Sequence, residues 1–380
     1  MGARMGLENY LHWVALGLVP GLGARLSGKL LQRFTTPERI FAASLTELES
    51  YRMPAAVAQA IHSQAALKDA EKELARIGEM GCRLIHWNEA EYPRLLREIY
   101  DPPVLLYVRG DAALLTRHSI AMVGTRKPTP YGNQMAERLA RDLAERGLVI
   151  VSGLARGIDS VAHGGALATE RGASVGILGC GVDVVYPKEN KKLFAKMMER
   201  GAIVSEFPLG AYPAPQNFPI RNRIIAGMVL GVVVVEGAQY SGSLITARLG
   251  IEFGREVYGV PGNATQPSSF GPNHLIKQGA KLVTGWEDVI DELPTEIRAQ
   301  LVPVETATTP EQRALLVEET LSPAEKTLYA LLGTDEARHV DELVETSGLN
   351  SSEVLATLFE LEMKGYIRQM PGKQFVKVLM

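Results

Sequence analysis

The stretch SIAMVGTRKPTPYGNQMAERLARDLAERGLVIVSGLARGID, residues 119–159, decides the fold of this chain. Its pattern predicts a short apolar strand ending at Gly124, a loop, an amphipathic helix beginning near Asn133, and a second apolar strand ending at Gly153. A strand, a helix and a second strand in this order form one βαβ unit with parallel strands. Each strand is followed by a loop that enters a helix, and ligands of open α/β sheets bind at that edge.

The same alternation continues on both sides of this stretch, over residues 81–293. Nine short β-rich runs alternate with amphipathic segments: CRLIHW, VLLYVRG, SIAMVG, LVIVSG, ASVGILG, AIVSEF, GVVVVEG, EVYGVPG and KLVTG. Repeated βαβ units predict an α/β fold built on a Rossmann-like, mostly parallel sheet.

Two further units flank the predicted sheet. Residues 1–80 have apolar residues three and four apart, which predicts an N-terminal helical domain of the SAM or helix-hairpin-helix type. The Pro-Gly-Leu-Gly turn at residues 20–23 would offer backbone amides to a phosphate, although a plain tight turn in a helical interaction domain explains it equally well. Residues 294–320 are a predicted linker. Residues 321–380 have three helical patterns followed by a hairpin pattern, which predicts a winged helix.

Composition narrows the possible functions. Lys and Arg total 40 against 43 Asp and Glu, a formal charge of −3, so any site for nucleic acid must be a local patch. The two cysteines, Cys82 and Cys180, cannot form a disulfide framework and lack the neighbours of a zinc knuckle, which fits a reduced cytoplasm. The apolar run at residues 228–235 is too short to span a bilayer, and Pro20 and glycines interrupt residues 11–23, unlike a signal peptide.

The loop after the strand at residues 119–124 combines residue types that suit a phosphate. Gly124 lets a ligand approach the backbone, while Thr125, Arg126 and Lys127 supply a hydroxyl group and two cations. A surface turn with two solvated cations is the competing interpretation.

The next predicted strand ends in a similar combination. Ser152 and Gly153 close the strand, and Arg156 follows three residues later. His163 lies one helical turn beyond Asp159, but no carboxylates and histidines with metal-ligand spacing surround it, so we assign it no chemistry.

A third strand-end loop supplies an aromatic face and a charge. The segment GCGVDVVYPKEN, residues 179–190, begins with a partial G-x-G, but Val184 replaces the third glycine of a dinucleotide fingerprint, so no cofactor is expected. Tyr186 offers a face for base stacking and Lys188 a charge for a phosphate, with Asn190 beside them. A core tyrosine and an exposed lysine form the competing interpretation.

Two helix-opening segments add further groups that favour anions. In NFPIRNRIIAG, residues 217–227, Arg221 and Arg223 stand near the predicted start of a helix, close to Phe218. In SGSLITA, residues 241–247, hydroxyl and amide groups form a predicted anion-binding nest at a helix start. The predicted contact residues of this second segment are Ser241, Gly242, Ser243 and Thr246. A serine N-cap is an alternative that does not exclude anion binding.

Taken in series, these segments resemble the DprA/Smf family of DNA-processing proteins. The resemblance is carried by VGTRKPTPYG, SGLARGID, GCGVDVVYPKEN, SEFPLG, NFPIRNRIIAG, VVVVEG, SGSLITA and VPGN, within residues 92–291. It implies that Arg126, Lys188 and the loops around Ser152, residues 218–223 and residues 241–246 line a basic pocket for single-stranded DNA. It also implies a homodimer made through the Rossmann-like domain, and handover of protected DNA to the RecA recombinase during natural transformation.

The expected activity is binding and loading without catalysis. The chain has no GxxxxGK[ST] motif for ATP and no GxSxG elbow. The alternative is a Rossmann-like nucleotide phosphoribohydrolase with Glu206 or Glu236 as its catalytic carboxylate, but YSGSLIT stands where that group has PGGxGT. A purely scaffolding protein is a third possibility that leaves the cationic loops unexplained.

The winged-helix segment has the wrong charge for a reader of duplex DNA. From Pro323 to Met380 six basic residues stand against nine acidic ones, a net charge of −3. The predicted third helix carries Glu353, Glu360 and Glu362 against a single Lys364. Because a phosphate backbone repels carboxylates, we predict that this unit contacts protein instead of duplex DNA.

Overall fold

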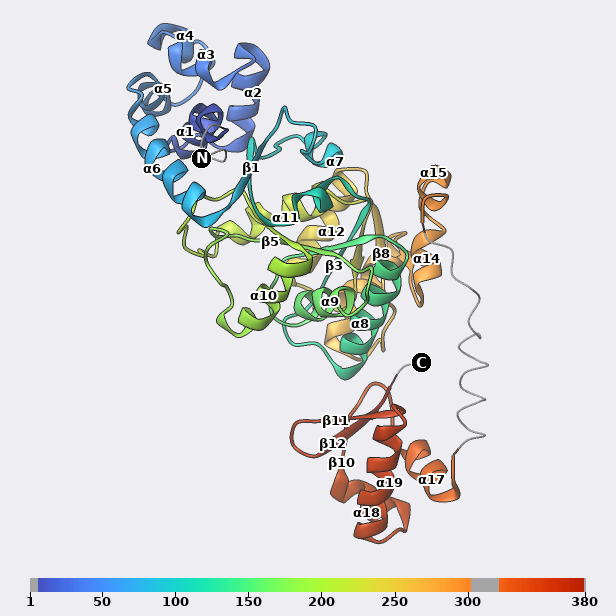
Figure 1. Cartoon of the computed structure of the whole chain (residues 1–380). Helices are drawn as coiled ribbons and strands as arrows, with labels where there is room; N and C mark the ends of the chain where they lie inside the picture. The colour runs from blue at the N-terminus through green and yellow to red at the C-terminus, as the bar shows by residue number, and fades with distance from the viewer. Residues whose placement is uncertain (1–5, 302–320, 379–380) are drawn as a thin grey trace.

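The computed structural model of the chain describes residues 6–301 and 321–378. Figure 1 shows an N-terminal group of helices, a central α/β part and a C-terminal winged helix, with the α/β part between the other two. The predicted fold class, a mostly parallel α/β sheet with a helical unit before it and a winged helix after it, is confirmed.

The central sheet has nine strands in the order β1-β2-β6-β5-β4-β3-β7-β8-β9. Each of the nine runs predicted as strands forms one of them. The strands from β6 to β9 in this order are parallel, while β1 and β2 extend one edge in antiparallel pairing. Their bounds are β1 Arg83–His86, β2 Leu105–Gly110, β3 Ser119–Val123, β4 Val149–Ser152, β5 Ser174–Ile177, β6 Ala202–Ser205, β7 Gly231–Val234, β8 Glu256–Gly259 and β9 Lys281–Leu282.

The chain changes direction in the sheet at β3. From β3 the strands proceed through β4, β5 and β6 on one side, and then through β7, β8 and β9 on the other. The carboxyl ends of β3 and β7 therefore flank a topological switch point, the place where ligands bind in open α/β sheets.

Helices cover both faces of the sheet because its strands are apolar on both sides. Ile120 and Met122 of β3 pack into one core with α8 (Pro130–Glu145) and α9 (Ile158–Leu167), while Ala121 and Val123 face a second core with α11 (Asn217–Gly227) and α12 (Gly242–Glu252). This alternation is the period of two expected for a strand. The helices of the central part are α7 Arg94–Arg97, η2 Ala112–Thr116, α8 Pro130–Glu145, α9 Ile158–Leu167, η3 Lys188–Asn190, α10 Lys191–Arg200, α11 Asn217–Gly227, α12 Gly242–Glu252, η4 Pro267–Ser269, α13 Phe270–Lys277, α14 Trp286–Ile290 and α15 Thr295–Arg298.

The N-terminal helices pack against the sheet and form a hydrogen bond with the loop after β6. Their hydrophobic core continues into the sheet edge, where Leu16 and Tyr107 belong to the same cluster. The carboxylate of Glu73 accepts a hydrogen bond from the backbone N–H of Leu209 at 2.6 Å. The helices are η1 Leu7–Tyr10, α1 Leu11–Leu18, α2 Ala24–Phe34, α3 Pro37–Ala42, α4 Leu45–Glu49, α5 Ala55–His62 and α6 Ala65–Met80. Residues 20–23 form the turn between α1 and α2, and both interpretations of that turn stand.

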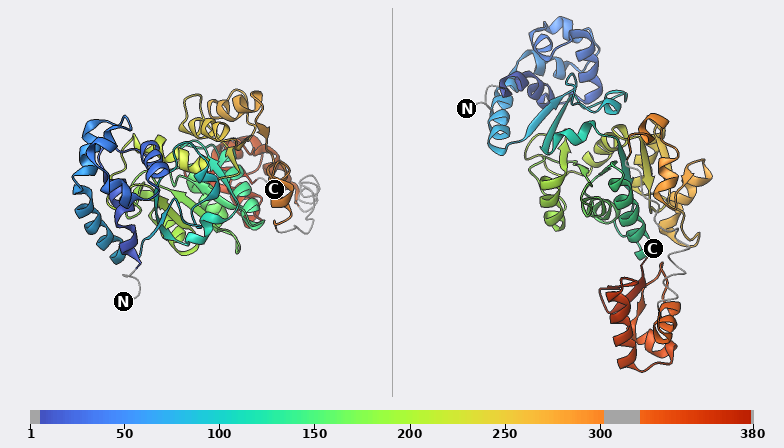
Figure 2. Two further views of the ribbon diagram at one scale, coloured as in Figure 1. Left: turned by 90° about the horizontal axis from the view of Figure 1, so that it is seen from above. Right: turned by 45° about the vertical axis from the view of Figure 1, so that its right-hand side comes forward.

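The C-terminal unit has the order predicted for a winged helix. Its elements are α17 Pro323–Leu331, β10 Arg338–His339, α18 Val340–Ser347, α19 Ser351–Met363, β11 Ile367–Met370 and β12 Gln374–Lys377. It has a hydrophobic core of its own. The right-hand view of Figure 2 shows it beyond the α/β part, at the end opposite the N-terminal helices.

A hydrogen bond and an ion pair join the winged helix to α8 among the described residues. Gln134 Nε2 donates to the backbone carbonyl of Lys377 at 2.8 Å, and Arg368 forms an ion pair with Glu137 at 3.1 Å. Of the predicted linker, residues 302–320 lie outside the described residues. Across the described ranges, none of the helices is both long enough and apolar enough to cross a membrane.

Candidate nucleic-acid interface

A small pocket of about 30 Å³ opens at the carboxyl ends of β3, β4 and β5, beside the first turns of α11. We call it the Arg126 pocket. It is lined by Arg126, Gly153, Ala155, Arg156, Leu178, Gly179, Cys180, Tyr186, Pro187, Phe218 and Arg221. None of these lining residues is acidic. The structure thus brings together six predicted site residues that come from four separate segments of the chain.

Arg221 forms a buried cationic part of this pocket, since its side chain is only 6% exposed. Its Nη1 donates to the carbonyl oxygen of Gly153 at 2.6 Å and also to the carbonyl oxygen of Ile177. Its Nε has no hydrogen-bond partner among the described residues. A side chain at position 153 would place its Cβ 2.3 Å from Nη1, so this close approach requires glycine. A buried cation with an unused donor favours an anion in the pocket.

Asp159 stabilises the charge of Arg221. Burial raises the pKa of the Asp159 carboxyl, while Arg221 and the backbone amides of Ala155 and Gly153 act against that rise. Burial lowers the pKa of Arg221, and Asp159 opposes this in turn. Burial also lowers the pKa of His163 to about 3, so this histidine is neutral and packs under the loop, where it accepts a hydrogen bond from the Leu154 N–H at 3.3 Å.

Two aromatic rings form a wall of the Arg126 pocket. The rings of Tyr186 and Phe218 stack with centroids 5.7 Å apart and an angle of 26° between their planes. The guanidinium carbons of Arg126 and Arg221 each lie 5.9 Å from the centroid of the Phe218 ring. Tyr186 is 39% exposed, so a base has access to an aromatic surface flanked by cations.

The rim of the pocket carries exposed charges. Arg126, Arg156 and Lys188 are all exposed, and Lys188 directly follows the lining residue Pro187. Arg156 forms an ion pair with Glu189. A hydrogen bond to its own backbone and the pair with Arg156 hold the pKa of Glu189 below its usual range. At neutral pH this carboxylate therefore competes with any phosphate for Arg156.

A second hollow adjoins the Arg126 pocket at the switch point. We call it the Tyr240 hollow. It is lined by Gly124, Thr125, Arg126, Ala238, Gln239, Tyr240, Ser241, Pro267 and Phe270. Arg126 lines both hollows, and the Thr125 N–H donates to the Glu236 carbonyl at 2.8 Å, which joins the loops after β3 and β7. Arg126, the segment leading to Lys188 and the Ser241 turn therefore meet at one rim of the sheet.

Two residues of the Tyr240 hollow were missed as site residues in the sequence. Tyr240 is 92% exposed and Phe270 is 41% exposed. Each of these aromatic residues stands among Gly, Ser and Pro in a segment that follows β7 or β8. That sequence pattern could have identified them as site residues. Lys127 and Gly242, which were predicted as contacts, are exposed beside the hollows but line neither.

Several predicted contact residues support the loops from inside. Ser152 is fully buried and its hydroxyl donates to the Met122 carbonyl at 2.6 Å. Ser243 and Thr246 are 6% and 2% exposed. These three residues line neither hollow, whereas the equally buried Arg221 does, so the prediction of direct contact is corrected for Ser152, Ser243 and Thr246.

Ser241 and Asn190 also hold backbone in place. The Ser241 hydroxyl accepts the Ser243 N–H at 3.4 Å as the N-cap of α12, so the N-cap alternative is correct and Ser241 still lines the Tyr240 hollow. Asn190 Nδ2 donates to the Leu154 carbonyl at 2.7 Å and to the Ser160 hydroxyl at 2.8 Å. Asn190 therefore ties the loop after β5 to the loop after β4.

Arg223 is not part of the interface, which corrects a second prediction. It is 6% exposed, forms an ion pair with Glu206 and lies 3.5 Å from a carboxylate oxygen of Asp101. α11 begins at Asn217, so Arg221 and Arg223 lie within the helix and not at its first turn. Residues two apart on a helix point about 200° from each other, so only Arg221 faces the Arg126 pocket.

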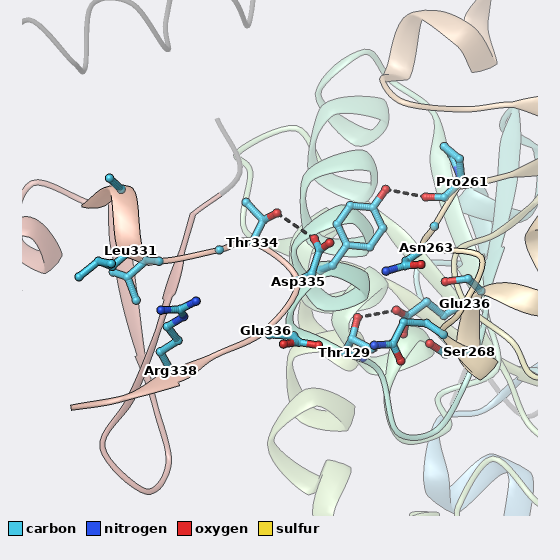
Figure 3. A pocket seen from close by; sticks show the side chains of 17 residues that line it. Thr129, Glu236, Pro261, Asn263, Ser268, Leu331, Thr334, Asp335, Glu336 and Arg338 are labelled. Atoms are coloured by element: carbon cyan, nitrogen blue, oxygen red, sulfur yellow. Dashed lines mark hydrogen bonds between the residues drawn. The ribbon is translucent and has the colours of Figure 1, made fainter. Parts of the chain in front are cut away.

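A larger pocket of about 660 Å³ lies between the α/β part and the winged helix. Figure 3 shows Thr129 and Glu236 on one side of it, with Thr334, Asp335 and Glu336 on the other. Its lining contains three carboxylates and one arginine, Arg338. This excess of negative charge makes it unsuitable for a phosphate backbone.

Neither carboxylate of the hydrolase alternative lines the Arg126 pocket. Glu236 accepts hydrogen bonds from both the N–H and the hydroxyl group of Thr129, and Glu206 is bound to Arg223. Both oxygens of Glu236 are thus held by Thr129 and one oxygen of Glu206 by Arg223, and the alternative is not favoured.

Comparisons with known proteins agree with this geometry. The family model described as DNA recombination-mediator protein A matches residues 83–294, and the model described as DprA winged helix domain matches residues 306–373. The chain is 40% identical over 309 residues to Protein Smf of Escherichia coli (strain K12), covering 80% of each chain.

Two solved structures are similar in fold and sequence. One is DNA processing protein A (DprA) from Streptococcus pneumoniae, with a TM-score of 0.64 and 34% identity over 76% of this chain and 98% of the other. The second is DNA processing protein A from Helicobacter pylori, described for its single-stranded DNA binding mode, with a TM-score of 0.50 and 31% identity over 55% and 94% of the two chains.

Proposed function

Because the chain belongs to the DNA recombination-mediator protein A family, we propose that it binds single-stranded DNA in the Arg126 pocket and passes it to a recombinase. One observation carries the proposal: cationic and aromatic side chains from separate strand-end loops meet around one pocket that has no acidic lining residue. Cations attract the phosphates, and the rings of Tyr186 and Phe218 offer stacking faces that accept any base. The relative from H. pylori is described as binding single-stranded DNA, which supports the same use here.

The proposed contact surface is continuous over both hollows. Its members are Gly124, Thr125, Arg126, Lys127, Gly153, Arg156, Tyr186, Lys188, Phe218, Arg221, Ser241 and Gly242, extended by Tyr240 and Phe270. Asn190 holds this surface in shape without needing to touch the strand.

The family resemblance also supports the later steps of the proposal. The protein would act in the cytoplasm as a homodimer through its α/β part, protect incoming DNA, and load the RecA recombinase during natural transformation. Mass measured in solution, with and without oligo-dT, tests the homodimer.

We propose that this activity involves no catalysis, since Glu206 and Glu236 are both held by protein groups. Incubation with a panel of nucleoside monophosphates tests this directly. Release of a free base would restore the hydrolase alternative.

Substitution of the rim cations tests the binding proposal. Arg126→Ala and Lys188→Ala should each weaken binding of oligo-dT and oligo-dC alike, by about fivefold or more, because phosphate contacts carry no base preference. Lys196→Ala is the matched control, since Lys196 is an exposed lysine of α10 that lines neither hollow. A gel-shift titration measures the affinities. Unchanged affinity in both Arg126→Ala and Lys188→Ala would reject the Arg126 pocket as the binding site.

A further inference from the structure

The third helix of the winged helix, α19, has an exposed apolar face. Leu355, Phe359 and Met363 are 55%, 64% and 72% exposed. They are four residues apart, so they form one stripe along the helix, which we call the α19 stripe. The opposite face of α19 is already occupied, because Val354, Leu358 and Leu361 are buried in the core of the winged helix. The stripe residues therefore do not contribute to the hydrophobic core of the winged helix.

The charges around the α19 stripe are negative. Glu353 and Glu360 are exposed on the same helix, and Glu362 lies beside Met363. The cation nearest the end of the helix, Lys364, is bound by the buried carboxylate of Glu325 at 2.6 Å. Because a DNA reader presents this helix to phosphates, an apolar stripe among carboxylates opposes binding of duplex DNA.

The docking of the winged helix on the α/β part leaves the α19 stripe uncovered. Arg368 and Lys377, which contact α8, belong to β11 and β12. In Figure 1 this hairpin lies on the side of the winged helix that faces the α/β part. The exposed fractions of the stripe residues hold with all described parts of the chain in place.

We propose that the α19 stripe docks a cationic amphipathic segment of a second protein. The apolar stripe would bury the apolar face of that segment, and the glutamates around it would pair with basic side chains at its edges. Charge decides between the possible occupants. A second copy of α19 would bring its own glutamates against these. Residues 302–320 of this chain contain four glutamates and one arginine, so they too would be repelled.

A designed peptide probes this surface in the full-length protein. The probe is a helical peptide with leucines on one face and lysines on the other, and the control is a scrambled peptide of the same composition. Fluorescence anisotropy with labelled peptides should show at least about tenfold tighter binding of the amphipathic probe. Phe359→Ser should remove most of that preference. Ile251→Ser is the matched control, because Ile251 is an isoleucine of α12 that is 58% exposed.

Charge reversal and two further measurements complete the test. Glu360→Lys should weaken binding of the leucine–lysine probe and strengthen binding of a leucine–glutamate version. Phe359→Ser should leave oligo-dT binding unchanged, which separates this surface from the Arg126 pocket. Equal binding of scrambled and amphipathic probes, or no effect of Phe359→Ser on their difference, would overturn the proposal. So would loss of duplex-DNA binding in Phe359→Ser, or loss of self-association in that variant, since each would assign the stripe to another occupant.

Discussion

At the scale of single residues, Phe218 organises the Arg126 pocket. Its ring stacks on Tyr186 and lies near the guanidinium groups of both Arg126 and Arg221. Arg221 is buried and held by backbone carbonyls, whereas Arg126 is exposed on a loop. The pocket thus combines one buried, hydrogen-bonded cation with one exposed cation.

Glu189 is the residue whose removal should improve binding. Its carboxylate pairs with Arg156 at the rim, so Glu189→Gln should free this cation and raise the affinity for oligo-dT by roughly two- to fivefold. Glu199→Gln on α10 is the matched control for the loss of one exposed carboxylate. Equilibrium titration at fixed ionic strength measures the change. If Glu189→Gln binds oligo-dT with wild-type affinity, Arg156 does not belong to the proposed interface.

At the scale of secondary-structure elements, the interface depends on loops that brace one another. The Gly237 N–H donates to the Ser268 carbonyl at 2.6 Å, and the Gly271 N–H donates to the Gly237 carbonyl at 2.7 Å. These bonds hold the loop after β7 against the segment that opens α13. Tyr240 and Phe270 are thereby presented from two different loops on the same hollow.

Tyr240→Ala should weaken binding only of strands long enough to leave the Arg126 pocket. Loss of one stacked base costs about 1–3 kcal/mol, so the affinity for longer oligo-dT should fall about fivefold or more. The shortest oligomers that bind should be unaffected, in contrast to Arg126→Ala. Tyr212→Ala is the control, because this tyrosine is 78% exposed but lines neither hollow. A loss that is the same at every oligo-dT length would show that Tyr240 does not extend the strand's path.

At the scale of the whole molecule, positive charge is concentrated locally at the Arg126 pocket. The chain has a formal charge of −3, and the pocket between the α/β part and the winged helix is acidic. The Arg126 pocket, by contrast, has three arginines and no carboxylate in its lining. This distribution would direct a single strand to one rim of the sheet and repel it from the acidic pocket.

This charge distribution predicts a shallow salt dependence. Four exposed cations, Arg126, Lys127, Arg156 and Lys188, would contact the strand, and each phosphate neutralised contributes about −0.7 to the slope for single strands. A plot of log affinity against log salt concentration should therefore have a slope of about −3. A slope steeper than about −4 would mean that a larger basic surface takes part.

The sequence by itself determined the elements, their order and the edge of the sheet that carries the site. Each of the nine β-rich runs forms a strand, because apolar runs of that length between Gly and Pro signals have few other stable conformations. Strand-end loops meet at one edge of any parallel sheet, so Arg126, Tyr186 and the Ser241 turn were predictable as neighbours.

The tertiary structure alone decided which way each side chain faces. From the sequence alone, Arg221 and Arg223 are equally good candidates for the site. Because residues two apart on a helix point in nearly opposite directions, Arg221 faces the Arg126 pocket and Arg223 pairs with Glu206. Ser152 and Thr246 looked available in the sequence but are buried, and Tyr240 was overlooked but is exposed. Residue type and spacing record what a side chain is able to do, whereas its burial depends on packing partners that are distant in the sequence.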